Sequence, residues 1–298
     1  MPQLAPIALF VYNRPSHTKQ TLSYLKRNKL FNDSELYIFC DGPKADATNE
    51  QMAKIDELHS LFNAENLPNI AQLIKQEKNI GLANSITFGI NKVFELHEKV
   101  IVIEDDILTS PDFLEYMNKA LNHYENEERV MHISGFIPPI NTNKIKEDYV
   151  FVKNASCWGW GTWKKAWANF PKSDEEIAKQ IPNLNKRDFD YGNNYHRMLN
   201  RALKKEIDSW AIKWYYAIYQ KKGLCLHPIK SLTKNIGLDN SGIHSSKSHL
   251  LDKGKLNTVS SYNFPDANEG MNFTAEKKFR QFFFMNRLRK LVYQVFGI

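Results

Sequence analysis

Short apolar runs divide the first half of the chain at regular intervals, and polar or turn-forming residues bound each run. Runs of this kind are typical of strands buried on both faces of a parallel sheet. They predict strands over residues 7–12, 36–40, 70–74, 100–103 and 130–134. Between and after them, apolar residues recur at helical spacing. This second pattern predicts helices over residues 16–28, 49–61, 81–96, 111–124, 186–205 and 211–220.

The order of these elements indicates the fold class. Strand and helix alternate through the first half, which favours an α/β fold with a mostly parallel sheet flanked by helices. Ser16 is expected to cap the first helix, and Ser110-Pro111-Asp112 has the composition of a helix start. The second half is expected to be a more helical region. The last stretch, from about residue 271, reads as a basic helix.

The acidic triplet Glu104-Asp105-Asp106 directly follows the apolar run at 100–103. Three adjacent carboxylates repel one another, so they add no stability to a sheet edge. A cation or polar ligand at the carboxyl end of the strand would explain them, since open α/β sheets bind ligands there. A solvated acidic turn before a helix is the alternative.

Two further polar positions follow strands in the same way. Arg14 comes after the first predicted strand, and Asp41 comes after the second. Because the carboxyl ends of parallel strands share one edge, we expect both to lie near the acidic triplet. An arginine, an aspartate and an acidic cluster on one edge predict a site for a nucleotide and a metal ion.

Composition changes this picture in three respects. The chain has 298 residues, enough for one large core, and 42% of them are hydrophobic. The formal net charge of +7 indicates an anionic partner such as a nucleic acid, a nucleotide or an anionic membrane. The three cysteines lack CxxC spacing, and no signal sequence or membrane-spanning stretch is evident. We therefore expect a reduced, cytoplasmic protein that is soluble or peripheral to a membrane.

The second half contains three segments with candidate chemistry. Trp158, Trp160, Trp163 and Trp167 form either a core cluster or, with the glycines between them, a platform for a sugar face. Residues 235–244 have the composition either of a loop that closes over a phosphate or of a solvated turn. The C-terminal helix is rich in phenylalanine and cations, which favours contact with an anionic membrane over docking on the core.

These motifs together resemble the nucleotide-sugar glycosyltransferases of the GT-A fold, and within them the N-acetylglucosaminyltransferase I-like group. The resemblance extends over about residues 6–244 and is strongest at Glu104-Asp105-Asp106 with the Ser110-Pro111-Asp112-Phe113 that follows. It also includes Arg14, Asp41, a Gly-Trp segment, an acidic-Trp pair, and Cys225, Pro228, Ser231 and Thr233. It implies a Rossmann-like GT-A domain, residues 1–136 binding the donor and residues 137–270 binding the acceptor, with residues 271–298 as an appended helix.

The resemblance also implies roles for single residues. Asp106 would bind Mn²⁺ or Mg²⁺, and the donor, a UDP-sugar in most relatives, would contact Arg14, Asp41, Glu104 and Asp105. The acceptor would then meet the tryptophan platform at Trp158 and Trp160. Relatives carry two acids before a tryptophan, whereas this chain has Asp208-Ser209-Trp210. Asp208 is therefore the expected catalytic base of an inverting transfer. Asp188, Asp190 and Glu206 are the alternatives.

Other functions fit the sequence less well or remain open. A sugar-nucleotide pyrophosphorylase would need a glycine-rich loop after the first strand, and residues 12–21 contain no glycine. A nucleic-acid-binding protein is not supported by any recognisable motif. In addition, much of the basic charge lies in the terminal helix. A degenerate transferase that binds without turnover remains open. The expected acceptor is a glycan or lipid-linked saccharide for surface polysaccharide, used at the cytoplasmic face of an inner membrane.

Overall fold

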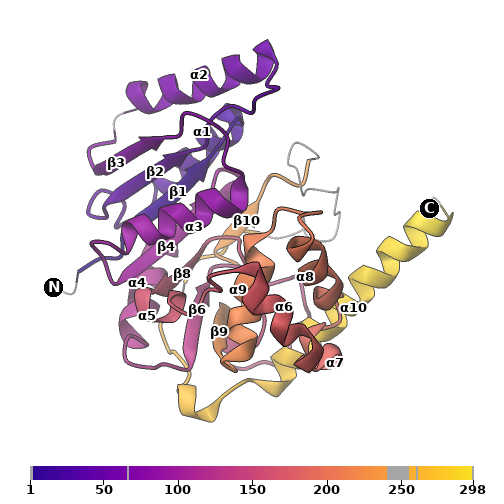
Figure 1. The fold of residues 1–298 in the computed structure, drawn as a ribbon. Coiled ribbons are helices and arrows are strands. Elements are labelled where there is room, and N and C mark those ends of the chain that lie inside the picture. Colours follow the sequence, from indigo (N-terminus) through magenta and orange to yellow (C-terminus); the bar gives the residue numbers. More distant parts are fainter. Residues whose placement is uncertain (1–2, 66, 240–254, 260, 297–298) are drawn as a thin grey trace.

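The computed structural model describes residues 3–65, 67–239, 255–259 and 261–296. An eight-stranded sheet with the strand order β3-β2-β1-β4-β8-β6-β9-β7 runs through the molecule (Figure 1). Its strands are β1 (Ile7–Val11), β2 (Leu36–Cys40), β3 (Ile70–Lys75), β4 (Lys99–Glu104), β6 (Val130–Ser134), β7 (Tyr149–Val152), β8 (Trp160–Trp163) and β9 (Leu224–Pro228). A second, two-stranded sheet pairs β5 (Ile107–Thr109) with β10 (Thr233–Asn235).

The sheet is mostly parallel. Strands β3, β2, β1 and β4 are parallel neighbours, and β9 lies parallel to β6. Strand β8 is antiparallel to both β4 and β6, and β7 is antiparallel to β9. The predicted α/β class with a mostly parallel sheet is therefore confirmed.

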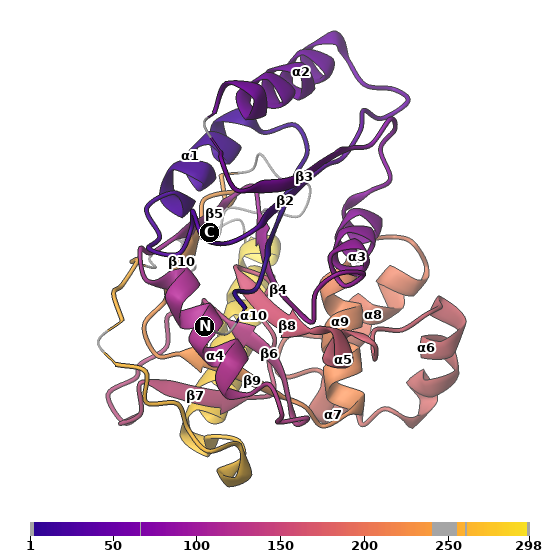
Figure 2. The ribbon, with the colours of Figure 1, turned by 90° about the vertical axis from the view of Figure 1, so that its left-hand side faces the viewer.

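Helices cover both faces of this sheet. They are α1 (Pro15–Leu25), α2 (Asn49–Ala64), α3 (Leu82–Val93), α4 (Phe113–His123), α5 (Lys164–Trp167), α6 (Asp174–Gln180), α7 (Lys186–Phe189), α8 (Tyr195–Leu203), α9 (Trp210–Gln220) and α10 (Phe273–Phe296). Figure 2 shows α1 and α4 on one side of the sheet, with α3 and α9 on the other. No helix within the described ranges has both the length and the apolar composition needed to cross a bilayer.

Several helix predictions need correction at their ends, since the helix predicted over 16–28 ends at Leu25 and the one predicted over 81–96 ends at Val93. Arg14 rather than Ser16 is the N-cap of α1, because Pro15 already occupies the first helical position. Helix α4 begins at Phe113, two residues later than expected. The helix predicted over 186–205 is divided into α7 and α8. Gly192 and Asn194 adopt positive φ angles of 83° and 60°, which end the first helix before the second begins.

The centre of the core is the strand that the apolar run predicted. Residues Val100 to Ile103 of β4 are completely buried. Next to β4, Trp160 of β8 is also completely buried, with ring centroids 5.1 Å from His132 and 5.2 Å from Trp210. Strand β8 thus joins the tryptophan segment to the sheet through close aromatic packing.

Candidate functional site

Arg14 and the acidic triplet meet at the carboxyl ends of two neighbouring strands. Arg14 follows β1, Glu104 is the last residue of β4, and the two strands pair side by side. The guanidinium forms an ion pair with Asp105, and its Nε donates a second bond to this carboxylate at 3.2 Å. It lies 3.0 Å from Asp106 Oδ2 as well. The predicted convergence of the arginine and the triplet is present in the structure.

Helix α1 holds the triplet from one side. Thr21 Oγ1 donates a hydrogen bond of 2.8 Å to the backbone carbonyl of Asp105. One turn earlier, His17 Nε2 lies 3.2 Å from Asp239 Oδ2. Since α1 starts directly after Arg14, one short connection positions both the guanidinium and the residues that fix Asp105.

The segment 235–239, here called the strap, covers the triplet from the other side. The N–H of Ile236 donates to the backbone carbonyl of Asp106 at 2.9 Å. A Cβ placed on Gly237 would collide with Asp106 Oδ2 and lie 2.9 Å from Arg14 Nη1. A side chain at this position would therefore displace either the Asp106 carboxylate or the strap. The rest of the loop predicted over 235–244, residues 240–244, lies outside the described residues.

The carboxylates of the triplet strongly influence one another. Burial, followed by the charges of Asp106 and Asp105, raises the pKa of Glu104 to about 8. Burial also raises the pKa of Asp105 to about 6, although the neighbouring Arg14 opposes this shift. The same contacts raise the pKa of Arg14, which remains a cation. The site therefore concentrates more negative charge than its single arginine neutralises, which favours a further cation.

Asp106 provides the test of whether a metal ion fits here. Its Oδ2 is paired with Arg14, whereas its Oδ1 is buried and has no hydrogen-bond partner within the described part of the chain. A buried carboxylate oxygen without a partner is costly, and carboxylate oxygens are the ligands that Mn²⁺ and Mg²⁺ prefer. No group of three or more His, Cys, Asp or Glu side chains in the described ranges could hold a metal alone. The residues fit an ion that takes one protein ligand and completes its shell from a bound ligand.

Asp41 and Asp208 form a second polar group on the β2 side of the same edge. The carboxylate of Asp41 accepts bonds from the N–H groups of Gly42, Ile80 and Gly81 and from the Asn79 side chain, at 2.9 to 3.1 Å. Burial raises its pKa, those backbone bonds lower it, and the charge of Asp208 raises it again. Asp41 thus fixes the connection between β3 and α3.

Asp208 is exposed and lies at the N-terminus of α3. Its Oδ2 accepts a bond of 3.2 Å from the N–H of Ala83, and a Cβ on Gly81 would lie 2.9 Å from the same oxygen. A carboxylate at this position lies at the positive end of the α3 dipole. The contact also connects the start of α3 to the segment just before α9.

The predicted sugar platform fits only one of its two tryptophans. Trp160 is completely buried, so its ring is part of the core and has no face for an acceptor. Trp158 is half-buried and packs edge-on against Phe136, with centroids 4.4 Å apart. Trp158 lies before β8 begins, whereas all four residues of the strand itself are buried. The predicted contact of Trp160 with an acceptor sugar is therefore wrong, and the contact of Trp158 stays a prediction.

Sequence reasoning missed one residue near the triplet and a second residue near that one. Burial raises the pKa of Cys157, and the next causes are the charges of Glu104 and Asp106, so this partly exposed thiol lies within electrostatic reach of both. Tyr195 of α8 is close to Cys157 in turn, and its hydroxyl accepts a 2.9 Å bond from Asn154. No motif marks either residue. Only the sheet order, which places β8 next to β4, brings the segment before β8 to the triplet.

Comparisons with known proteins place the chain only loosely. No family model matches it, and no curated protein does. Among solved structures, it overlaps with a mannosyltransferase from Pyrobaculum calidifontis in complex with GDP-Man and Mn²⁺, at 11% identity, a TM-score of 0.40, and coverage of 74% of this chain and 75% of the other. It also overlaps with GalNAc-T7 in complex with UDP, GalNAc and Mn²⁺, at 10% identity and a TM-score of 0.45. That overlap covers 76% of this chain but only 43% of GalNAc-T7. Because these structural similarities are weak, a function for this chain has to be argued from its own residues.

Proposed function

We propose that the protein is a metal-dependent glycosyltransferase that moves a sugar from a nucleotide-sugar donor to a glycan or lipid-linked acceptor. One observation carries the proposal. Asp106 lies at the carboxyl end of a central parallel strand, paired with Arg14 through one oxygen and buried without a partner through the other. A site of this kind suits a hard cation and a diphosphate together.

The donor would bind across the ends of β1 and β4. Arg14 would contact the nucleotide, while Glu104 and Asp105 would accept bonds from the ribose and sugar hydroxyls. A divalent cation held by Asp106 would supply charge neutralisation for the departing diphosphate. The donor base would lie toward Asp41, and a UDP-sugar is the donor proposed from the sequence resemblance. The strap would exclude water from the same place.

We assign the base of an inverting transfer to Asp208. Its carboxylate would take the proton of the acceptor hydroxyl as the hydroxyl oxygen forms a bond to the anomeric carbon. The bond from that carbon to the diphosphate oxygen breaks, and a nucleoside diphosphate leaves. The three alternative acids are engaged elsewhere: Asp188 with Arg280, Asp190 with the N–H of His196, and Glu206 with Arg201. Asp208 is the acid of the four that lies beside Asp41.

Release of nucleoside diphosphate tests this proposal without knowledge of the acceptor, since glycosyltransferases hydrolyse donors slowly when water replaces the acceptor. The full chain would be incubated with UDP-sugars and GDP-sugars, with and without Mn²⁺. We expect release from one donor class that needs the metal ion. Asp106→Asn should reduce it by about 10²-fold or more, the range for losing one strong electrostatic interaction in a transition state.

Two comparisons make the result specific. Asp33→Asn changes an exposed aspartate elsewhere on the surface and should leave release unchanged. Asp208→Asn should retain donor binding and lose transfer to an acceptor. Release that needs no metal ion and survives Asp106→Asn would contradict the proposal. Metal-dependent binding without turnover of any donor would favour the degenerate binding protein instead.

A further inference from the structure

Helix α10 is divided into a docked part and a free face. In its first turns, Ala275 and Phe279 are completely buried in the hydrophobic cluster beneath α8 and α9. Glu276 accepts a bond of 3.1 Å from the N–H of Lys153 in addition to one from the Tyr191 hydroxyl. Arg280 forms an ion pair of 2.8 Å with Asp188. These turns are held by the core, as the docking alternative predicts.

The docked side of α10 extends only as far as the turn between α7 and α8. A Cβ on Gly192 would lie 2.7 Å from the backbone carbonyl of Arg280, so this turn presses directly on the helix. Farther along, Arg287 Nη1 donates a bond of 2.7 Å to Asn194. Beyond that contact the helix extends past the rest of the molecule, as Figure 1 shows at the C-terminal end.

An apolar stripe follows the side of α10 that is turned away from the core, with Phe284 at its edge beside the turn at Gly192. It consists of large side chains that are between 36% and 51% exposed: Phe284, Met285, Leu288, Leu291 and Val292. Their spacing of three, four and seven residues places them on one face of the helix. Other parts of the surface expose large apolar residues singly, and Leu96 is an example at 71%. A continuous exposed stripe indicates a contact surface.

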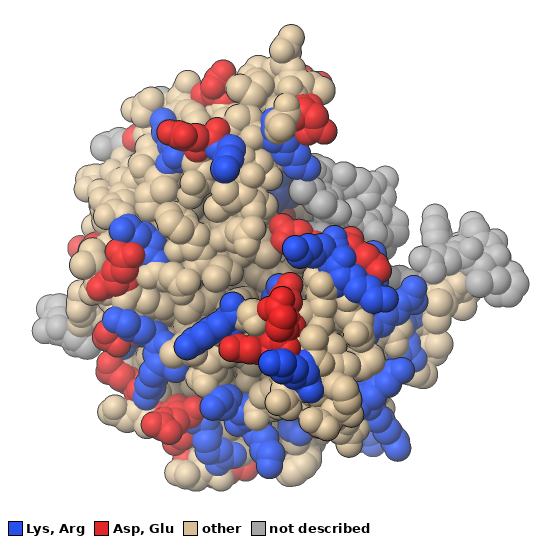
Figure 3. Space-filling model, viewed as in Figure 1, with Lys and Arg blue, Asp and Glu red and all other residues tan. Residues whose placement is uncertain are grey.

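The charge beside the stripe is of one sign. From Lys277 to the end of the sequence there are six Lys and Arg residues and no Asp or Glu. In Figure 3, Lys and Arg lie along the edge of the molecule below the projecting part of α10, with little Asp or Glu among them. The stripe and these cations together have the composition of a helix that lies in a membrane interface.

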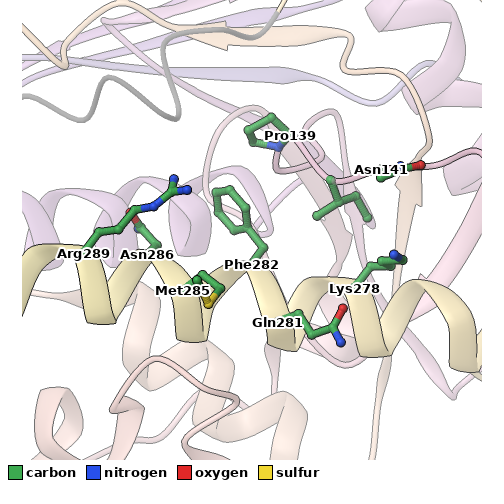
Figure 4. Close-up of a pocket in the computed structure, with 9 residues that line it drawn as sticks. Pro139, Asn141, Lys278, Gln281, Phe282, Met285, Asn286 and Arg289 are labelled. Carbon is green, nitrogen blue, oxygen red and sulfur yellow. The ribbon is translucent and has the colours of Figure 1, made fainter.

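A groove adjoins the stripe where α10 passes the loop at residues 139–141. It has a volume of about 350 Å³ and includes Lys278, Phe282, Met285 and Arg289 among its lining residues. Figure 4 shows the Phe282 ring directed across the groove toward Pro139, with Lys278 and Arg289 at opposite ends. An apolar floor with a cation at each end suits an amphiphile with an anionic headgroup.

We propose that the outward face of α10 binds the surface of an anionic lipid bilayer. The stripe would enter the boundary between headgroups and acyl chains, while Lys277, Lys278 and Arg289 would lie at the level of the lipid phosphates. Cations near such a surface each strengthen binding about fivefold, and the apolar stripe adds the burial term. The docked turns would hold the enzyme body at a fixed orientation above the bilayer.

A second copy of the chain fits this face less well. Two α10 stripes in contact would bring Lys277, Lys278 and Arg289 of one helix against the same cations of the other, with no acid from residue 277 onward to compensate. Like charges in contact destabilise an association. An anionic bilayer presents the opposite sign and has an apolar interior for the stripe.

Vesicle sedimentation of the full chain tests the proposal independently of donor turnover. Vesicles would consist of phosphatidylcholine alone or of phosphatidylcholine with phosphatidylglycerol. We expect binding to the anionic vesicles only, weakened by salt. The triple variant Leu288→Ser/Leu291→Ser/Val292→Ser, all exposed side chains, should weaken it about tenfold or more, and Arg289→Gln should weaken it about fivefold.

Matched variants separate a specific face from the general positive charge of the protein. Leu96→Ser removes an exposed leucine elsewhere and Lys165→Gln removes an exposed cation elsewhere, so both should bind vesicles like the wild type. Equal losses for Lys165→Gln and Arg289→Gln would overturn the proposal. So would the absence of binding to anionic vesicles, or a concentration-dependent dimer that the triple variant abolishes.

Discussion

Gly237 is the residue at which the backbone passes the Asp106 carboxylate. Because a Cβ there would collide with Asp106 Oδ2, Gly237→Ala should displace the strap and break the bond from Ile236 to Asp106. Overpacking of this kind lowers the free energy of unfolding by about 1–3 kcal/mol. Chemical denaturation of the variant measures it.

A double-mutant cycle shows whether that loss comes from the predicted collision. In an Asp106→Ala background the carboxylate is absent, so Gly237→Ala should cost at least about 1 kcal/mol less than in the wild type. Equal costs in both backgrounds would mean that the strap does not depend on its contact with Asp106.

His132 is a buried histidine whose hydrogen bonds define its neutral form. Trp214 Nε1 donates to its Nδ1 at 3.3 Å, which leaves Nε2 to donate to the carbonyl of Ser156 at 3.1 Å. Burial, followed by the charge of His227, lowers the pKa of His132 to about 3. The unfolded chain, with an ordinary histidine pKa of about 6.5, binds this proton more readily.

The sign of the pH effect follows from that difference. Stability contributed by neutral His132 is complete above pH 6.5 and is lost as the pH falls toward 3. His132→Phe removes this titration, although it leaves the Trp214 N–H without an acceptor. Between pH 7 and pH 4.5 the wild type should therefore lose about 2 kcal/mol more stability than the variant. Equal losses in urea unfolding at the two pH values would show that His132 is not neutral in the folded protein.

Single residues also show how far the sequence could predict the site. Arg14 and the triplet were predictable because each directly follows an apolar run, and parallel strands end on one edge. The pairing of Arg14 with two of the acids, which leaves one oxygen of Asp106 without a partner, depends on side-chain geometry that no spacing contains. Cys157 reaches the triplet only through the position of β8.

At the level of elements, β8 is one of the strands that the sequence did not predict, together with β5, β7, β9 and β10. Its residues Trp160 to Trp163 read as an aromatic cluster, and the glycines between them hide any alternation. In the structure β8 lies antiparallel between β4 and β6, so it joins the donor side of the sheet to the second half. Strands β1 to β4 and β6 were predictable because continuous apolar runs have few other solutions.

Removal of Trp160, in β8, and of Trp158, just before it, should have different effects on stability. Trp160→Ala should lower the free energy of unfolding by about 3–5 kcal/mol, because it removes the ring that stacks on His132 and Trp210. Trp158→Ala should cost markedly less, since that ring is only half-buried. Thermal and chemical denaturation of the two variants provide the comparison. A larger loss for Trp158 would contradict the packing described here.

At the scale of the whole molecule, the sheet assembles one edge from distant parts of the chain. Arg14, Asp41, Asp106, Asp208 and Gly237 come from the beginning, the middle and the second half of the sequence. Arg14 and Asp41 lie on the same edge as the triplet because of the strand order alone. Asp208 and the strap reach the edge through α9 and through the pairing of β10 with β5, and long-range pairings of this kind leave no local pattern in a sequence.

Calorimetric titration of nucleotides into the full chain, with and without Mn²⁺, is the most direct test of the central claim. UDP, GDP, CMP and dTDP would be compared on the wild type and on Asp106→Asn. We predict that one diphosphate binds tightly only with the metal ion, and that Asp106→Asn weakens this binding by about 10²-fold, the effect of losing one buried charged ligand. Binding that ignores both Mn²⁺ and the substitution would contradict a metal-assisted nucleotide site at Asp106.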